Sequence, residues 1–507
     1  MKSLLQNPLR WTGHLLSALT DPARRERAMI AVLAVYTLLW ACYGVIAKGS
    51  QDVHPDMAEL FAWAREPSFG YLKHPPFAAW VVKLWFAVFP AADWSYYLLG
   101  AVTASVGLWI IWRLCARYLD AGKRVLAIAL LSLIPFFGFH ALKYNVNTVL
   151  IPLWAATTLC FLRSFETRSI PWAALAGICA AAAMLGKYWS IFLLAGLALA
   201  ALADSRRSVY FRSAAPWVTV AAGALALAPH LAWLVAYDFA PFSYAVTLHG
   251  AKNFTGAAMS AAGYLAGGAG YAALPVVLVL IAARPSRSAL AEMLWPPKPE
   301  RRLIANAFWL PFLLPALAAL ATRIEINSLW AMSVWTLFPA VLLAPRISIS
   351  RKEAVKILAL AVAFPLVMLA ASPFIANSIH RGGMPSEQTH ASVLAPSVER
   401  TWRETTNKPL RLVTGDLAYQ LAFYLPDRPG AFPDFDMSNS PWINEARIAR
   451  DGIVMVCRAS HQNCMTHMER RAAAGPAGKR QTVTIARRHS GSDGNPERYL
   501  IVTIPPK

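Results

Sequence analysis

Residues 52–77 read DVHPDMAELFAWAREPSFGYLKHPPF and form a short polar stretch between long apolar runs. The stretch holds six ionisable side chains that draw attention, those of Asp52, His54, Asp56, Glu59, Lys73 and His74. Charged groups this close to hydrocarbon are costly, so an acidic and basic cluster at a membrane edge indicates a functional site. The alternative interpretation is an ordinary solvated loop whose charges have no chemical role.

The composition is that of a polytopic membrane protein. Of the 507 residues, 57% are hydrophobic and only 15% are charged, whereas about a quarter of the residues in a soluble protein are charged. The net charge of +21 does not indicate nucleic-acid binding, because Lys and Arg gather between the apolar runs, where they set topology. Residues 1–28 are too polar and basic for a signal peptide, so the first apolar run is expected to remain as a span.

Apolar runs of about 20 residues, the length of helix that crosses a bilayer, recur along the chain. The sequence predicts about eleven spans, at 29–47, 94–112, 125–140, 146–162, 172–186, 189–203, 216–236, 264–284, 303–321, 327–344 and 353–373. A tight hairpin is expected at Lys187, because one helix over 172–203 would bury its charge near mid-membrane. Residues 77–89 are too short to span and favour an interfacial helix.

Basic residues set the expected orientation, because short cytoplasmic loops are enriched in Arg and Lys. With the N-terminus inside, one set of loops carries nearly all the basic clusters, such as Arg24, Arg25 and Arg27, and the opposite loops carry few. The predicted organisation is a cytoplasmic segment at 1–28, a transmembrane domain at 29–373 with its first outer loop at 48–93, and a periplasmic domain at 374–507. The expected location is therefore a bacterial inner membrane.

The segment 374–507 is charged, rich in turns and much less apolar than the rest. Short β-type runs at 411–415, 453–457, 482–486 and 499–504 and a helix at 417–424 predict a small α/β domain, with 382–397 as a linker or loop. In an oxidising compartment Cys457 and Cys464 are expected to form a disulfide bond. A metal site that adds His461 and His467 is less favoured, since nothing completes a four-ligand set.

Polar residues that interrupt the spans fall mostly on the outer side in this topology. Besides those of the first loop they are Lys143, Tyr144, Asn145, Asn147, Lys187, Tyr188, Tyr237, Asp238, His249, Arg323, Glu325 and Asn327. A carboxylate can take a proton from a hydroxyl or amine nucleophile, and Lys and Arg can hold a departing phosphate. The pattern predicts an outward pocket for group transfer from a phosphate-activated, lipid-borne donor, although each residue alone could be an interfacial anchor.

The runs DMAELFAWAR and GYLKHPPFAAW resemble the first outer loop of membrane glycosyltransferases of family 39 and its relatives, the protein mannosyltransferases and aminoarabinose transferases. The similarity continues through KYNVNTVLIPLW, AAAMLGKYWSIFLL and INSLWAMSVW, and weakly through GDLAYQLAFYLPDRPG. The resemblance implies a GT-C fold, a polyprenyl-phosphate sugar as donor and transfer on the outer face of the membrane.

The resemblance also implies roles for individual residues. Asp56 matches the catalytic acidic position, but Met57 follows it where the family has a glutamate, so the base is Asp56, Glu59 or, with less support, Asp52. Lys73 and His74 match the charged pair before Pro-Pro, where the family has an acidic residue and Lys. Together with Lys187 and Arg323, which come from the outward polar residues and not from the resemblance, they are expected to bind the donor phosphate. The substrate site is expected to include Lys143, Tyr144, Asn145, Asn147, Tyr188, Asp238, His249, Glu325 and Asn327. No metal ligands are assigned, and a divalent metal cofactor is left open.

These observations predict an inner-membrane glycosyltransferase that moves a sugar from a polyprenyl-phosphate donor to a lipid or cell-envelope glycan. The resemblance also implies inversion at the anomeric carbon by one direct displacement, which needs a single base. Two alternatives belong to other classes. A transporter of lipid-linked sugars would need broken helices near mid-membrane and often repeat symmetry, and neither is evident. A non-catalytic envelope-assembly subunit would leave the acidic first loop without a role.

Overall fold

The computed structural model describes residues 8–251, 253–474 and 478–507. The chain divides into two compact units, and each is described by itself. The first unit comprises Met1–Ala41, Lys73–Phe77 and Leu98–Met368, and the second comprises Cys42–Leu72, Ala78–Tyr97 and Leu369–Lys507. The first unit is helical, and the second combines residues 42–72 and 78–97 with a sheet domain.

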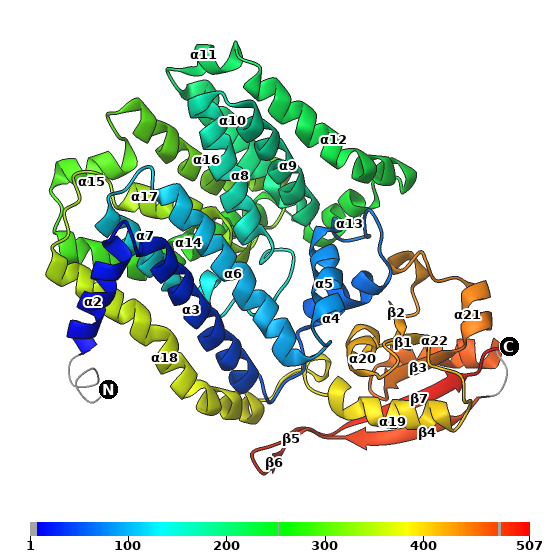
Figure 1. Ribbon diagram of the computed structural model, residues 1–507. Coiled ribbons are helices and arrows are strands. Elements are labelled where there is room, and N and C mark those ends of the chain that lie inside the picture. Colours follow the sequence, from blue (N-terminus) through cyan, green and yellow to red (C-terminus); the bar gives the residue numbers. More distant parts are fainter. Residues whose placement is uncertain (1–7, 252, 475–477) are drawn as a thin grey trace. The chain divides into compact units, whose positions relative to one another are not determined.

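The first unit holds most of the long apolar helices (Figure 1). Its helices, three of which continue into the second unit, are α2 (Pro8–Thr20), α3 (Arg25–Ala47), α6 (Asp93–Cys115), α7 (Ala121–Ser132), α8 (Leu150–Thr167), α9 (Ile170–Gly186), α10 (Ile191–Ala203), α11 (Arg207–Phe211), α12 (Ala215–Ala236), α13 (Ala240–His249), α14 (Phe254–Ala283), α15 (Arg287–Leu294), α16 (Pro299–Thr322), α17 (Phe338–Leu342) and α18 (Arg351–Gly382). Helix α9 packs against α8 and α12, and α10 packs against α16.

Six helices within the described residues are long and apolar enough to cross a membrane, namely α3, α6, α12, α14, α16 and α18. Shorter apolar helices cover Phe77–Val88, Ile170–Gly186 and Tyr188–Ala203. The predicted polytopic helical membrane fold is therefore confirmed. The break at Lys187 is also confirmed, since α9 ends at Gly186 and a 3-10 turn separates it from α10.

Two expected spans are not continuous helices. Residues 327–344 form the 3-10 turns η3 (Ser328–Ala331) and η4 (Val334–Thr336), followed by the short helix α17. Pro339 lies in the first turn of α17, where its missing N–H costs nothing, and it could not continue an earlier helix. Residues 125–140 are interrupted in the same way, because Ile134 is extended before Pro135.

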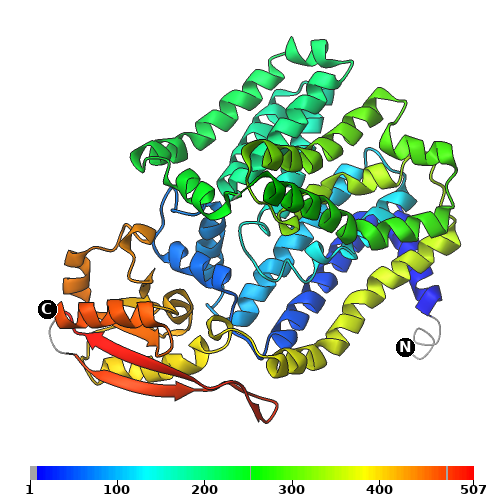
Figure 2. The same ribbon diagram turned by 180° about the vertical axis from the view of Figure 1, so that it is seen from behind.

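The second unit contains a five-stranded mixed sheet in the order β2-β1-β3-β7-β4. Strand β1 (Leu412–Gly415) pairs in parallel with β2 (Gly430–Pro433) and β3 (Ile453–Arg458). Strand β7 (Glu497–Ile504) runs antiparallel to β3 and to β4 (Arg480–Ile485), and the two red arrows of β7 and β4 lie side by side in Figures 1 and 2. A two-stranded ribbon joins β5 (Arg488–His489) to β6 (Ser492–Asp493).

Successive side chains of a strand point to opposite faces of the sheet, so the apolar strand β3 has apolar residues on both faces. Helices cover each face. Val454 and Val456 of β3 pack with α19 (Ala391–Arg403) and α20 (Ala418–Tyr424). The alternate residues of β3, among them Met455, pack with α21 (Glu445–Asp451) and α22 (Gln462–Ala474). The predicted small α/β domain is confirmed, although β2, β5 and β6 were not predicted from the sequence.

The expected linker at 382–397 is wrong in its second half, because α19 begins at Ala391. This helix is amphipathic and places Leu394, Val398 and Trp402 in the core of the second unit. Its N-terminus is capped by a side chain far away in the sequence, which no local pattern could reveal.

Candidate functional site

The polar stretch 52–77 begins with the short helix α4 (Pro55–Arg65), which belongs to the second unit. The His54 ring accepts a hydrogen bond from the Asp56 N–H at 3.1 Å and so caps the helix. Helix α4 buries Met57, Leu60 and neighbouring apolar residues on one side. Asp56 and Glu59 are three positions apart, so they share one face of the helix, and both are partly exposed.

Asp56 occupies the first turn of α4 with 43% of its side chain exposed. A carboxylate at this end of a helix is stabilised in its ionised form by the aligned peptide dipoles. The ionised form is the one that can accept a proton from a nucleophile. The geometry of α4 is therefore compatible with either Asp56 or Glu59 as a base.

Asp52 is in a very different environment. Its side chain is 0% exposed and forms an ion pair with Arg487. It also accepts hydrogen bonds from the Ala391 N–H at 2.7 Å and from the Ser392 hydroxyl at 2.6 Å. The Asp52 carboxylate thus accepts N–H groups at the start of α19, which the N-cap residue His390 does not bond with its side chain, and both of its oxygens are used within the fold.

A tyrosine that the sequence did not single out holds the same loop. The Tyr424 hydroxyl accepts a hydrogen bond from the Val53 N–H at 2.7 Å and donates to the Asp93 carboxylate at 3.1 Å. Burial raises the pKa of Tyr424 well above its usual value. The hydroxyl therefore stays protonated and acts as a fixed donor.

The first unit brings a second set of predicted residues together around Lys187. Its ammonium nitrogen donates a hydrogen bond to the Asn147 side-chain oxygen at 2.8 Å. The same nitrogen lies 4.4 Å from the centroid of the Trp330 ring, a cation–π distance. Lys187 is half-buried, so this cation is held between an amide oxygen and an aromatic face.

The turn that presents Lys187 is built by buried neighbours. Helix α9 ends at Gly186, where a side chain would crowd Leu150, and Lys187 itself is extended. The Ser190 hydroxyl donates to the Ala183 carbonyl at 2.8 Å and accepts from the Trp154 indole N–H at 3.0 Å. These bonds fix the chain on both sides of Lys187.

His249 lies beside the same tryptophan. Its ring meets the Trp330 ring edge to face, with the centroids 5.1 Å apart. Burial and then the positive charge of Lys187 lower the pKa of His249, so the imidazole is neutral near pH 7. The chain here is pinned by backbone bonds, from the Glu325 N–H to the His249 carbonyl and from the Ala251 N–H to the Arg323 carbonyl, both 2.7 Å.

The other predicted residues of the first unit have varied surroundings. Tyr188 exchanges a 3.0 Å hydrogen bond with His230, which the sequence did not identify. Asn145 and Asn327 use their side-chain oxygens to accept backbone N–H groups, from Asn147 at 2.9 Å and from Leu329 at 2.8 Å. Of the remaining predicted residues, Tyr144 is buried. Lys73, His74 and Lys143 are partly exposed, and Asp238, Arg323 and Glu325 are exposed.

The predicted site residues are therefore divided between the two compact units. Lys73, His74 and the residues around Lys187 belong to the first unit, whereas Asp56 and Glu59 belong to the second. Trp330 was missed because a tryptophan in an apolar sequence is most simply a packing residue, and only its position beside Lys187 distinguishes it.

One group of potential metal ligands occurs among the described residues. Ligand atoms of Asp416, His461 and Cys464 lie within 4.8 Å of one another. Cys464 is joined to Cys457 in a disulfide bond, so its sulfur is not available as a thiolate. Two ligands do not make the usual four-coordinate zinc site, so these residues do not fit a metal in this state.

Comparisons with known proteins agree with this fold. Residues 73–233 match the family model described as dolichyl-phosphate-mannose-protein mannosyltransferase. The lipid A galacturonosyltransferase RgtD of Rhizobium johnstonii is 22% identical over 189 residues, which are 37% of this chain and 39% of that relative. The match thus spans well under half of the relative's length.

Solved structures of ArnT from Cupriavidus metallidurans share the fold along nearly the whole chain. The structure bound to undecaprenyl phosphate aligns with a TM-score of 0.57 at 14% identity, covering 94% of this chain and 97% of the other. The apo structure aligns with a TM-score of 0.58 at 12% identity and the same coverage.

Proposed function

We propose that this chain, a GT-C-type and family 39-like membrane protein, is a glycosyltransferase. Its donor is a polyprenyl-phosphate sugar. The acceptor is a lipid or a cell-envelope glycan, and transfer takes place on the periplasmic face of the inner membrane. The C-terminal sheet domain lies on that same side.

The position of Lys187 is the observation that carries the proposal. Its ammonium group is held by Asn147 and Trp330. Lys187 and Asn147 lie within the part of the chain that matches the family model, residues 73–233. A compact cation fixed at the end of an apolar helix suits the phosphate of a lipid whose tail lies in the bilayer. The ArnT structure with the same fold is described as bound to undecaprenyl phosphate, which supports this class of donor.

In the proposed reaction an acceptor hydroxyl or amine attacks the anomeric carbon of the donor. A bond forms between the acceptor atom and this carbon, and the bond from the carbon to the phosphate oxygen breaks. Asp56 takes the acceptor proton, with Glu59 as the alternative base. The departing polyprenyl phosphate gains a negative charge, which Lys187, Arg323, Lys73 and His74 are proposed to stabilise.

The acceptor is proposed to be lipid-borne. The relative RgtD is named as a lipid A galacturonosyltransferase, so a saccharide lipid of that kind is a reasonable acceptor class for this chain. A single displacement would invert the anomeric configuration, which the product's stereochemistry reports directly.

A transfer assay tests the function. Purified protein in lipid vesicles is mixed with radiolabelled polyprenyl-phosphate sugar and total membrane lipid, and label in a new lipid or glycan product is measured. We expect transfer that Lys187→Ala strongly reduces, while Lys83→Ala, which removes an exposed lysine of helix α5 (Phe77–Val88), leaves it unchanged. Label that crosses the vesicle membrane without a new covalent product would instead identify a transporter.

A further inference from the structure

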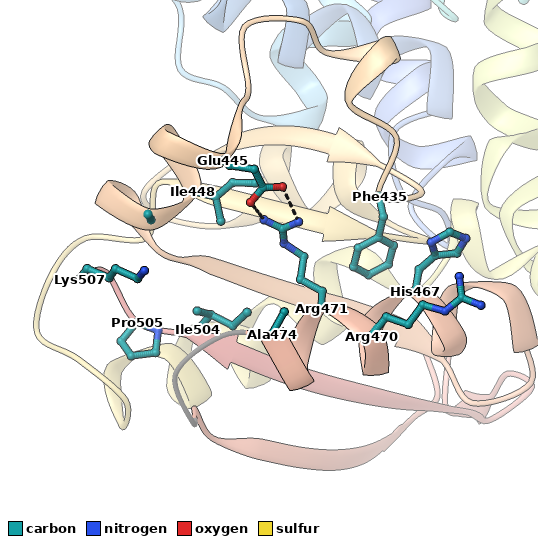
Figure 3. A pocket seen from close by; sticks show the side chains of 11 residues that line it. Phe435, Glu445, Ile448, His467, Arg470, Arg471, Ala474, Ile504, Pro505 and Lys507 are labelled. Carbon is teal, nitrogen blue, oxygen red and sulfur yellow. Dashed lines mark hydrogen bonds and ion pairs between the residues drawn. The ribbon is translucent and has the colours of Figure 1, made fainter.

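A cavity in the second unit lies apart in sequence from every residue proposed above for transfer. It has a volume of about 480 Å³ and is lined by the turn after β2, helices α21 and α22 and the end of β7. This volume falls within the range of pockets that bind small molecules. Figure 3 shows Phe435, His467, Arg470 and Arg471 around this hollow, which we call the basic pocket.

The lining of the basic pocket is cationic. Arg470, Arg471 and Lys507 contribute three positive side chains, and Glu445 is the one carboxylate among the lining residues. Arg470 is exposed and has no ion pair among the residues that the structure describes. Arginine presents a planar fork of N–H donors that matches phosphate and carboxylate groups.

The Arg471 side chain is held in place by Glu445 without any ligand. Its guanidinium makes two hydrogen bonds to the Glu445 carboxylate, at 2.9 and 2.6 Å. Its Nε is buried and has no acceptor within the described parts of the chain. Because this nitrogen is buried, a ligand in the cavity would contact Arg471 through its two terminal nitrogens, each of which has a second N–H besides the one bonded to Glu445.

An aromatic wall completes the pocket. Phe435 and the preceding Asp434 both have left-handed backbone conformations, with φ of 60° and 56°. Two successive non-glycine residues in this region are strained, and strain of this kind is typical of functional sites. The turn holds the Phe435 ring nearly parallel to the His467 ring, with 6.0 Å between centroids.

We propose that the basic pocket binds an anionic saccharide. Its phosphate or carboxylate would bind Arg470 and the terminal N–H groups of Arg471, and its apolar ring face would pack on Phe435. The ligand is either a free sugar phosphate or the phosphorylated sugar headgroup of a lipid. This site would be a recognition site of the sheet domain and does not depend on the transfer reaction.

Binding to the full-length protein in nanodiscs tests the proposal, and turnover is excluded because no polyprenyl-phosphate donor is added. The soluble probes are a hexose 6-phosphate, the unmodified hexose and inorganic phosphate, measured by titration calorimetry. We expect hexose phosphate to bind at least about tenfold more tightly than either of the others, and binding to weaken as salt is raised. In a second arm, vesicles carrying a phosphorylated glycolipid are compared with phosphatidylcholine vesicles, which separates a lipid headgroup from a free sugar.

Arg470→Gln and Phe435→Leu should each weaken binding of the preferred probe by about tenfold or more, the loss of one strong contact. Arg488→Gln is the matched control, because Arg488 is an exposed arginine of the same unit with 74% of its side chain accessible and does not line the pocket. Arg470 is exposed, so its replacement should not disturb the fold.

The proposal is overturned if neither hexose phosphate nor phosphorylated glycolipid binds, or if Arg470→Gln and Phe435→Leu bind like the parent protein. Equal affinity for inorganic phosphate would overturn the saccharide assignment. Because binding is measured without turnover, a protein with no transferase activity can still confirm the basic pocket. Likewise, an active transferase whose basic pocket binds no probe would overturn only this proposal.

Discussion

The side-chain carboxylate of Asp52 accepts a hydrogen bond from the backbone N–H of Ala391 at 2.7 Å, across 339 residues of sequence. The contact joins the start of the polar stretch 52–77 to helix α19 of the sheet domain within the second unit. Four residues after Asp52, Asp56 keeps 43% of its side chain exposed. Of these two nearby aspartates, Asp52 is buried in contacts within the fold, and Asp56 is partly exposed.

Asp52→Asn should destabilise the second unit. The change leaves Arg487, which is only 13% exposed, without its ionic partner, and breaking a buried ion pair costs about 3–5 kcal/mol. Thermal unfolding of the purified protein should shift to a clearly lower temperature. Asp493→Asn is the matched control, because Asp493 is exposed and its pair with Arg488 is long, at 3.9 Å. Wild-type stability together with lost activity would instead make Asp52 the base.

Asp56→Asn should lower transfer by at least about a hundredfold, the low end for general-base catalysis. Binding of the donor should survive, since the base acts on the acceptor. Glu59→Gln provides the comparison, because Glu59 lies on the same face of α4. Near-normal turnover in Asp56→Asn with none in Glu59→Gln would assign the base to Glu59. If neither variant is affected, Asp238 is the next carboxylate to test.

Lys187→Ala should raise the KM for the polyprenyl-phosphate donor by about tenfold or more, because a charge-assisted contact to phosphate is worth about 1.5–3 kcal/mol. Asn147→Ala should have a smaller effect of the same kind, since it removes the 2.8 Å bond that orients the ammonium group. Steady-state kinetics with varied donor concentration measure both. Unchanged donor KM in Lys187→Ala would remove Lys187 from the donor site.

The topology has a direct test. Alkaline phosphatase fused after Lys507 should be active, because the sheet domain is predicted to be periplasmic, and a fusion near Lys298 should be inactive. The reverse pattern would put the first outer loop and the sheet domain in the cytoplasm. It would also contradict the proposed face of the reaction.

The disulfide bond between Cys457 and Cys464 should be detected by counting thiols in the denatured protein. A thiol reagent should label the four other cysteines, Cys42, Cys115, Cys160 and Cys179, and should label all six only after reduction. The bond closes a short loop, so replacing either cysteine by serine should cost roughly 2–3 kcal/mol. Six labels without reduction would show that the bond does not form.

The sequence by itself determined the class of the protein. Composition and the lengths of apolar runs predict a polytopic helical membrane protein, and alternation with turn residues predicts the sheet domain, because both signals are local and periodic. Prolines within apolar runs misled the span prediction at 125–140 and 327–344, since hydrophobic length says nothing about where a helix is interrupted.

Only the tertiary structure decided what the individual polar residues do. The sequence favoured Asp56 over Asp52 only through the family resemblance, and the contacts that bury Asp52, with Ala391 and Arg487, are made hundreds of residues away. Lys187 is likewise a lone cation until Asn147 and Trp330 close around it. Burial and hydrogen bonding depend on contacts between distant segments, so the role of a charged side chain becomes definite only when the chain is folded.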